Sequence, residues 1–155
     1  MKNYKYEVID CDSEAYPNKL KQIDNPPKKL YLAGDISLLY TESVAIVGSR
    51  KFTAYGREIS QIIAKELAKC SITVVSGMAL GIDTFAHEAS LKANGKTIAV
   101  LGTGIDMVYP ASNRDLMEKI YNEGLIISEY EPNFSGTKFT FPLRNRIISG
   151  ISSKV

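Results

Sequence analysis

One pattern occurs three times along the chain: a short apolar run, a turn of small residues, and an amphipathic helix. The apolar runs are Val44–Val47, Ile72–Val75 and Thr97–Leu101, and a fourth run covers Leu125–Ile127. Strands that alternate with helices in this way form a parallel sheet whose two faces are covered by helices. The sequence therefore predicts an α/β fold of three layers with a parallel sheet in the middle.

The first apolar run and the helix after it give detailed expectations. Four apolar residues in a row at Val44–Val47 are typical of a strand that is buried on both faces. Farther along the chain, apolar side chains recur at helical spacing at Ile59, Ile62, Ile63 and Leu67. We expect these four side chains to form the buried face of a helix.

Residues 1–42 lack the repeating pattern. A short helical stripe there is broken at Pro26-Pro27, because proline lacks the backbone N–H and restricts the residue before it. Leu30–Leu32 then suggests a short strand. We expect residues 1–42 to form an N-terminal appendage packed on a main domain of residues 43–155. The last five residues suggest the approach to another strand, so the main domain is expected to be incomplete at its C-terminal end.

Composition limits the possible functions. The 155 residues carry a net charge of +2, which is too small to indicate a nucleic-acid partner by itself. The chain shows no signal peptide and no long apolar run, so we expect a cytoplasmic protein without a membrane partner. Cys11 and Cys70 lie far apart and His87 is the only histidine. We therefore expect no metal site, and no cofactor is expected.

The turns after the strands are candidates for holding a phosphorylated ligand. They are Gly48-Ser49-Arg50, Ser76-Gly77 and Gly102-Thr103-Gly104, and the carboxyl ends of parallel strands are where ligands bind in such sheets. Arg50 offers paired donors that match a phosphate group. A solvated arginine in an ordinary turn is an equally good interpretation of these residues alone. None of the turns fits a P-loop, and the third lacks the last glycine of the dinucleotide fingerprint.

Asp83 and His87 are four residues apart, so they share one face of the predicted helix. An acid–base role would need a nucleophile, and Ser76 is the nearest candidate along the chain. We favour a simpler hypothesis, in which an Asp–His hydrogen bond ties the start of the helix to a neighbouring loop.

A third candidate group lies near the end of the chain. Lys138, Phe141 and Arg144 are spaced three apart and can project together, whereas Arg144 and Arg146 cannot share a helix face. Two cations and an aromatic ring suit single-stranded nucleic acid, because the charges hold phosphates and the ring stacks on a base. The alternative places Phe141 in the core and leaves the cations in solvent.

These residues, taken in order, resemble the DNA-processing protein A family (DprA, also called Smf) from about Tyr16 to the end of the chain. The early matching stretches are Tyr16-Pro17, Leu30-Tyr31, Val44–Arg50 and Val74–Asp83. The later ones are Thr97–Gly102, Tyr109-Pro110, Ile127–Tyr130 and Phe141–Gly150. Each stretch is weak alone, but the ordered set is specific.

The resemblance implies a Rossmann-like domain that binds single-stranded DNA without catalytic turnover. The DNA-binding residues that it implies, together with the turn after the second strand, are Gly48, Ser49, Arg50, Ser76, Gly77, Lys138, Phe141, Arg144 and Asn145. It also implies that the protein protects incoming strands and helps to load a RecA-type recombinase during natural transformation and recombination. The full-length protein is expected to form a homodimer.

The alternative function is that of a nucleotide-binding enzyme or sensor of the wider superfamily. Lonely-guy phosphoribohydrolases use a similar glycine-rich turn, and the stretch Ser76–Asp83 would suit either function. These enzymes carry an Arg-Lys motif where this chain has Phe141–Arg146, which favours the DNA-binding interpretation.

Overall fold

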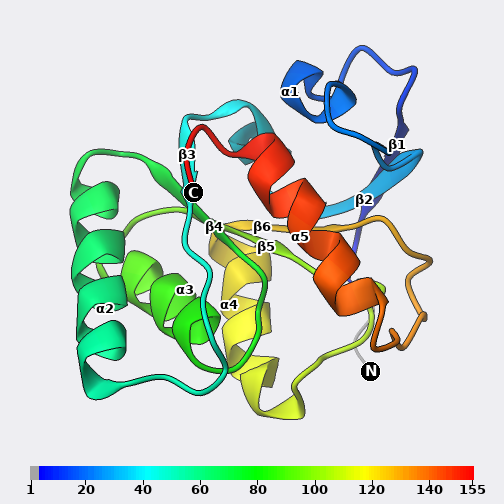
Figure 1. Cartoon of the computed structure of the whole chain (residues 1–155). Helices are drawn as coiled ribbons and strands as arrows, with labels where there is room; N and C mark the ends of the chain where they lie inside the picture. Colours follow the sequence, from blue (N-terminus) through cyan, green and yellow to red (C-terminus); the bar gives the residue numbers. More distant parts are fainter. Residues whose placement is uncertain (1–3) are drawn as a thin grey trace.

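The structure is a computed structural model that describes residues 4–155, and it contains one six-stranded sheet (Figure 1). The strands are β1 (Glu7–Asp10), β2 (Lys29–Gly34), β3 (Ser43–Ala45), β4 (Thr73–Ser76), β5 (Thr97–Val100) and β6 (Leu125–Ser128). The α-helices are α1 (Asn18–Lys21), α2 (Ala54–Lys69), α3 (Ile82–Lys92), α4 (Arg114–Glu123) and α5 (Thr140–Ile151). Two short 3-10 helices, η1 (Ile36–Tyr40) and η2 (Ala111–Asn113), complete the described elements.

The strand order is β1-β2-β6-β5-β4-β3, and the sheet is mixed. The four strands from β3 to β6 are parallel, as predicted, whereas β2 is antiparallel to β6 and β1 is antiparallel to β2. The predicted parallel sheet with helices on both faces is confirmed for β3 to β6, and the two antiparallel strands from residues 1–42 extend it. A strand as short as Leu30–Leu32 gives no signal in the sequence for its partner or its direction. Residues 1–42 supply β1 and β2 to the same sheet that contains β3 to β6, so this segment does more than pack against the main domain. The division into domains at that residue stays a prediction.

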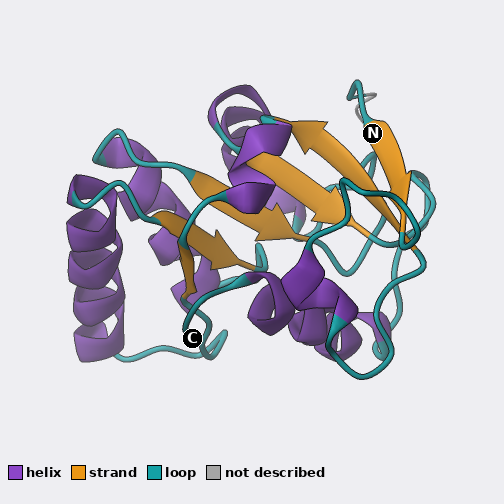
Figure 2. Cartoon of the chain, turned by 90° about the horizontal axis from the view of Figure 1, so that it is seen from above, coloured by secondary structure: helices purple, strands orange, loops and turns teal. Residues whose placement is uncertain are grey.

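Helices cover both faces of the sheet, as predicted (Figure 2). Alternate residues of each strand point to opposite faces. Val75, Ile98 and Ile127 pack on one face with Ile147 and Ile148 of α5. The other face carries α2, α3 and α4. Two apolar clusters lie on that face. The smaller cluster consists of Ala64, Val74 and Ala86. The larger cluster includes Met78, Ala99, Met117, Ile120 and Ile126.

Strand β3 lies at the edge of the sheet and is less buried than predicted. It ends at Ala45, and Val47 is 43% exposed. β3 is partly exposed because it is the last strand of the sheet, and among residues 4–155 no further full strand covers its outer side. Ser153 N donates to Ser43 O and Ala45 N donates to Lys154 O, both at 2.8 Å. The last residues therefore begin to pair with β3, while the incompleteness of the domain stays a prediction.

The buried face of α2 also differs from the prediction. Ser60 and Ala64 are buried, whereas Ile62 and Ile63 are 48% and 44% exposed. Ala64 belongs to one apolar cluster with Ala86 of α3, so α2 packs on α3 through small residues. A hydrophobicity pattern favours large apolar side chains and does not identify a close contact of this kind.

Candidate functional site

The loops after β3, β4 and β5 and the start of α5 enclose a groove at the carboxyl end of the parallel strands. This central groove is lined by Val47, Gly48, Arg50, Gly77, Ala79, Leu80, Asp83, Tyr109, Pro110, Lys138, Phe141, Pro142, Arg144 and Asn145. Its wider part has a volume of about 340 Å³. The structure thus brings together most of the predicted site residues from three distant segments, at the edge where open α/β sheets bind ligands.

Asp83 fixes the loop after β3 and the loop after β4 relative to each other. Its buried carboxylate accepts a hydrogen bond from Gly48 N at 3.3 Å and another from Gly77 N at 3.1 Å. Burial raises the pKa of Asp83, although Arg144 and the backbone donors act in the opposite direction. A side chain at Gly77 would meet both Asp83 and Arg144, since its Cβ would lie 2.7 Å from Arg144 Cζ and 2.9 Å from Asp83 Oδ2. The close packing of these groups therefore requires glycine at this position.

Arg144 joins the start of α5 to two strands. Its Nη1 donates to Gly77 O at 2.6 Å and to Val100 O at 2.9 Å, and its Nε donates to Asn145 Oδ1 at 3.0 Å. Only 6% of the residue is exposed, and burial lowers the pKa of its guanidinium. Arg144 lines the groove together with Lys138 and Phe141, as the spacing predicted. Its donors, however, are largely used within the protein, which the sequence did not indicate.

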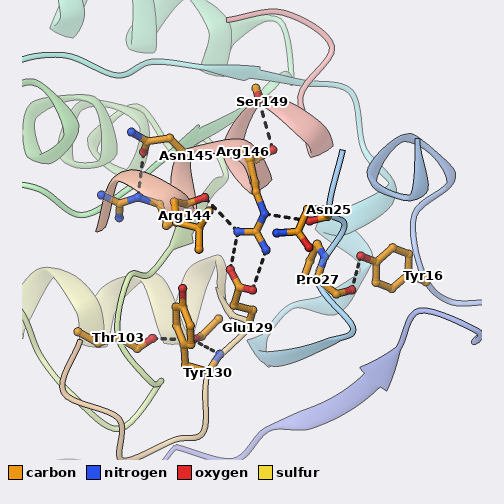
Figure 3. A network of polar contacts seen from close by, with 12 residues as sticks. Tyr16, Asn25, Pro27, Thr103, Glu129, Tyr130, Arg144, Asn145, Arg146 and Ser149 are labelled. Atoms are coloured by element: carbon orange, nitrogen blue, oxygen red, sulfur yellow. Dashed lines mark hydrogen bonds and ion pairs between the residues drawn. The ribbon is translucent and has the colours of Figure 1, made fainter. Parts of the chain in front are cut away.

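Arg146 points away from Arg144 and holds α5 against the N-terminal segment (Figure 3). Its Nη1 and Nη2 donate to the two carboxylate oxygens of Glu129 at 2.6 and 2.7 Å, and its Nε donates to Asn25 O. This paired geometry is the strong form of an arginine–carboxylate interaction. The two arginines thus lie on different faces, as predicted, and Arg146 positions the helix without reaching the groove.

The predicted hydrogen bond between Asp83 and His87 does not form. His87 is fully buried, and its Nε2 accepts from Met78 N at 3.3 Å. The hydroxyl of Thr97 donates to Val74 O, so the 2.7 Å contact between His87 Nδ1 and Thr97 Oγ1 makes Nδ1 the donor. Each of the two predicted partners therefore braces a different part of the loop after β4. At helical spacing a hydrogen bond is possible, but backbone donors nearby compete for both side chains.

Ser76 is not among the residues that line the central groove, and its contact with a ligand stays a prediction. It is fully buried, and its hydroxyl donates to Ile46 O. This geometry also separates Ser76 from any acid–base role with Asp83 and His87. Ser49 is exposed in the loop after β3, where its hydroxyl accepts from Lys51 N at 3.1 Å, but its side chain is not among those that line the groove.

Burial and the charge of Arg144 lower the pKa of His87 to about 3, which predicts a pH-dependent stability. The unfolded chain binds a proton at His87 with the ordinary pKa of about 6.5, while the folded chain does not, so stability falls as the pH falls. The free energy of unfolding should drop by about 2 kcal/mol between pH 7 and pH 5. Urea denaturation at both pH values measures it. His87→Gln should remove most of this difference, because the chain has no other histidine. An equal pH dependence in both proteins would contradict the assignment.

An aromatic pair lies on one wall of the central groove. The rings of Tyr109 and Phe141 lie 5.0 Å apart between centroids, and Tyr109 is 51% exposed. A Cβ on Gly102 would lie 2.5 Å from Phe141 Cδ1, so this glycine allows the ring of Phe141 to rest against the loop after β5. Sequence reasoning missed the contribution of Tyr109 and of the exposed Leu80. The Tyr109-Pro110 pair is one of the stretches that resemble the family. Its contact with Phe141 could not be predicted, because the two segments are far apart in the sequence.

Arg50 and Lys138 provide the accessible positive charge of the groove. Both side chains are exposed, and neither forms an ion pair within residues 4–155. The same part of the chain contains no group of three or more His, Cys, Asp or Glu residues that could hold a metal ion. None of its helices has the length and apolar character needed to cross a membrane. The groove thus offers two exposed cations without an ion pair beside an aromatic pair, and Lys138 Nζ lies 5.2 Å from the centre of the Phe139 ring.

Comparison with known proteins identifies the family. The profile of the DNA recombination-mediator protein A family matches residues 7–155. The chain belongs to this family. It is 45% identical over 153 residues to protein Smf of Synechocystis, and the match covers 96% of this chain and 38% of that protein. The chain therefore spans well under half the length of this relative.

Solved structures of the family have the same fold. The X-ray structure of DNA processing protein A from Streptococcus pneumoniae superposes with a TM-score of 0.90 at 41% identity, covering 96% of this chain and 52% of the other. DNA processing protein A from Helicobacter pylori, whose structure concerns its single-stranded DNA binding mode, gives a TM-score of 0.87 at 38% identity. That match covers 96% of this chain and 66% of the other. Family and fold predictions are thereby confirmed.

Proposed function

We propose that the central groove binds single-stranded DNA. The observation that supports this most is the meeting of Arg50, Lys138 and the Tyr109–Phe141 pair in one groove. Arg50 and Lys138 hold phosphates, while the aromatic rings stack on bases, which are accessible only in single strands. Gly48 and Gly77 form part of the wall of this groove. The H. pylori relative, described by its single-stranded DNA binding mode, supports the same assignment.

We further infer that Asn145 contributes to the groove wall, and that Arg144 acts mainly by holding the loops in place. The whole protein is proposed to protect incoming strands and to help load a RecA-type recombinase, as a homodimer. The name of the family, recombination mediator, supports this role. We propose no catalytic turnover, since Ser76 and His87 are both used in internal hydrogen bonds.

The experiment is a binding titration with a fluorescent oligothymidine. Two to four phosphate contacts predict that log K falls against log salt with a slope of roughly −1.4 to −2.8. A duplex of equal length should compete more weakly than an unlabelled single strand, because its bases cannot stack on the rings. Excess AMP should leave the complex intact. Affinity that does not change with salt would contradict the phosphate contacts, and displacement by AMP would favour a nucleotide sensor.

A further inference from the structure

A second groove lies between α2 and α3, on the face of the sheet opposite α5. Its lining residues are Arg57, Gln61, Lys65, Glu88, Ala89, Lys92 and Ala93, and its volume is about 540 Å³. Three of these residues are cationic and Glu88 alone is acidic. The lining of this groove therefore carries a local charge of about +2.

The three cations have no fixed acidic or hydrogen-bonding partner among the described residues. Arg57, Lys65 and Lys92 form no ion pair and no side-chain hydrogen bond within residues 4–155. Nearby lysines behave differently: Lys69 pairs with Glu66 at 3.2 Å, and Lys96 donates to a backbone oxygen at 3.3 Å. The lysines and the arginine of the second groove are therefore free to bind an anion.

The cations form a row along the groove. Arg57, Gln61 and Lys65 are four residues apart and therefore share one face of α2, where eight residues span about 12 Å. Lys92 faces the same groove from α3. A linear arrangement of charge suits an extended polyanion better than a single phosphate group.

The α2–α3 groove and the central groove share no lining residue, but both lie near the loop after β3. Both helices begin next to the loop after β3, where Ile82 N bonds with Ser49 O. The ring of Phe52 meets the ring of Phe85 at 4.6 Å between centroids, and the guanidinium of Arg57 lies 4.7 Å from the centre of the Phe85 ring. Phe52 is partly exposed and follows Arg50 by two residues. An aromatic surface thus connects Arg50 with the row of cations.

We propose that the α2–α3 groove is a second phosphate-binding track, which holds the backbone of single-stranded nucleic acid where it leaves the central groove. This inference rests on the proposed function of the central groove. Lysine and arginine side chains without fixed partners bind phosphates regardless of sequence. The track would therefore add affinity for longer strands and leave the binding of short ones unchanged.

The test compares two double variants with equal changes of charge. Lys65→Gln with Lys92→Gln removes cations from the track, and Lys69→Gln with Lys96→Gln removes cations outside it. All four side chains are exposed, so folding should be retained. Affinities are measured for oligothymidines of about 6 and about 20 nucleotides, because the shorter lies near the low end of common single-strand site sizes and the longer exceeds them.

The track variant should bind the short strand as the wild type does and the long strand about tenfold more weakly. Its salt slope for the long strand should become less steep by about 1.4. The control variant should match the wild type on both strands. Wild-type affinity of the track variant for the long strand, or equal losses in both variants, would overturn the second track alone. A wild-type chain that binds neither strand would overturn the proposed function as well.

Discussion

Replacing Arg144 by methionine should lower the free energy of unfolding by about 3–5 kcal/mol, the usual cost of breaking a buried charged interaction. The change leaves the buried carbonyl oxygens of Gly77 and Val100 without their donor. It also removes a positive charge that acts on the buried carboxylate of Asp83. Methionine fills much of the same volume, so the loss should come from unpaired polar groups. Urea denaturation at pH 7 measures the difference.

The matched control is Arg114→Met on α4, where the arginine is exposed. That variant should change the free energy of unfolding by less than about 0.5 kcal/mol. One outcome would contradict the structural role assigned to Arg144. If Arg144→Met unfolds with the wild-type free energy yet loses oligonucleotide affinity, the guanidinium contacts the ligand directly, as the family resemblance first implied.

Arg50→Ala and Phe141→Ala should both weaken binding of single strands, but for different reasons. Arg50→Ala removes a charge-assisted hydrogen bond, worth about 1.5–3 kcal/mol, and should affect all oligonucleotides alike. Phe141→Ala removes a stacking surface worth about 1–3 kcal/mol per base and should leave the salt dependence unchanged. Fluorescence anisotropy at one salt concentration gives both losses. Phe141→Ala with wild-type affinity, measured at a temperature where it is folded, would refute the stacking role.

The order of strands and helices could be predicted from the sequence because it depends on local patterns. Each parallel strand overlaps an apolar run, and small residues mark the turns after the first three of them. The antiparallel pairing of β2 with β6 could not be predicted in this way, because it connects Tyr31 with Ser128 across nearly a hundred positions. Local patterns likewise do not show that α2 packs through Ala64 rather than through its isoleucines.

The candidate site was predictable to a similar extent. Gly48, Arg50, Lys138 and Phe141 could be proposed from chemistry and from the family resemblance, and the structure brings all four to one groove. The separate roles of the side chains in and around that groove could not be predicted from the sequence. Ser76 and Arg144 carry polar groups that suit a ligand, but both make internal hydrogen bonds whose partners come from distant parts of the chain. Only the folded arrangement distinguishes a group that holds the loops from one that is free to bind.

The central claim is that Arg50 holds a phosphate in the central groove. The most direct measurement is the slope of log K against log salt for a fluorescent oligothymidine, compared between the wild type, Arg50→Ala and Lys119→Ala. Lys119 is an exposed cation on α4, so the control removes the same charge elsewhere. Loss of one single-strand phosphate contact should make the slope less steep by about 0.7 in Arg50→Ala and leave it unchanged in Lys119→Ala. Equal slopes in all three proteins would contradict the claim.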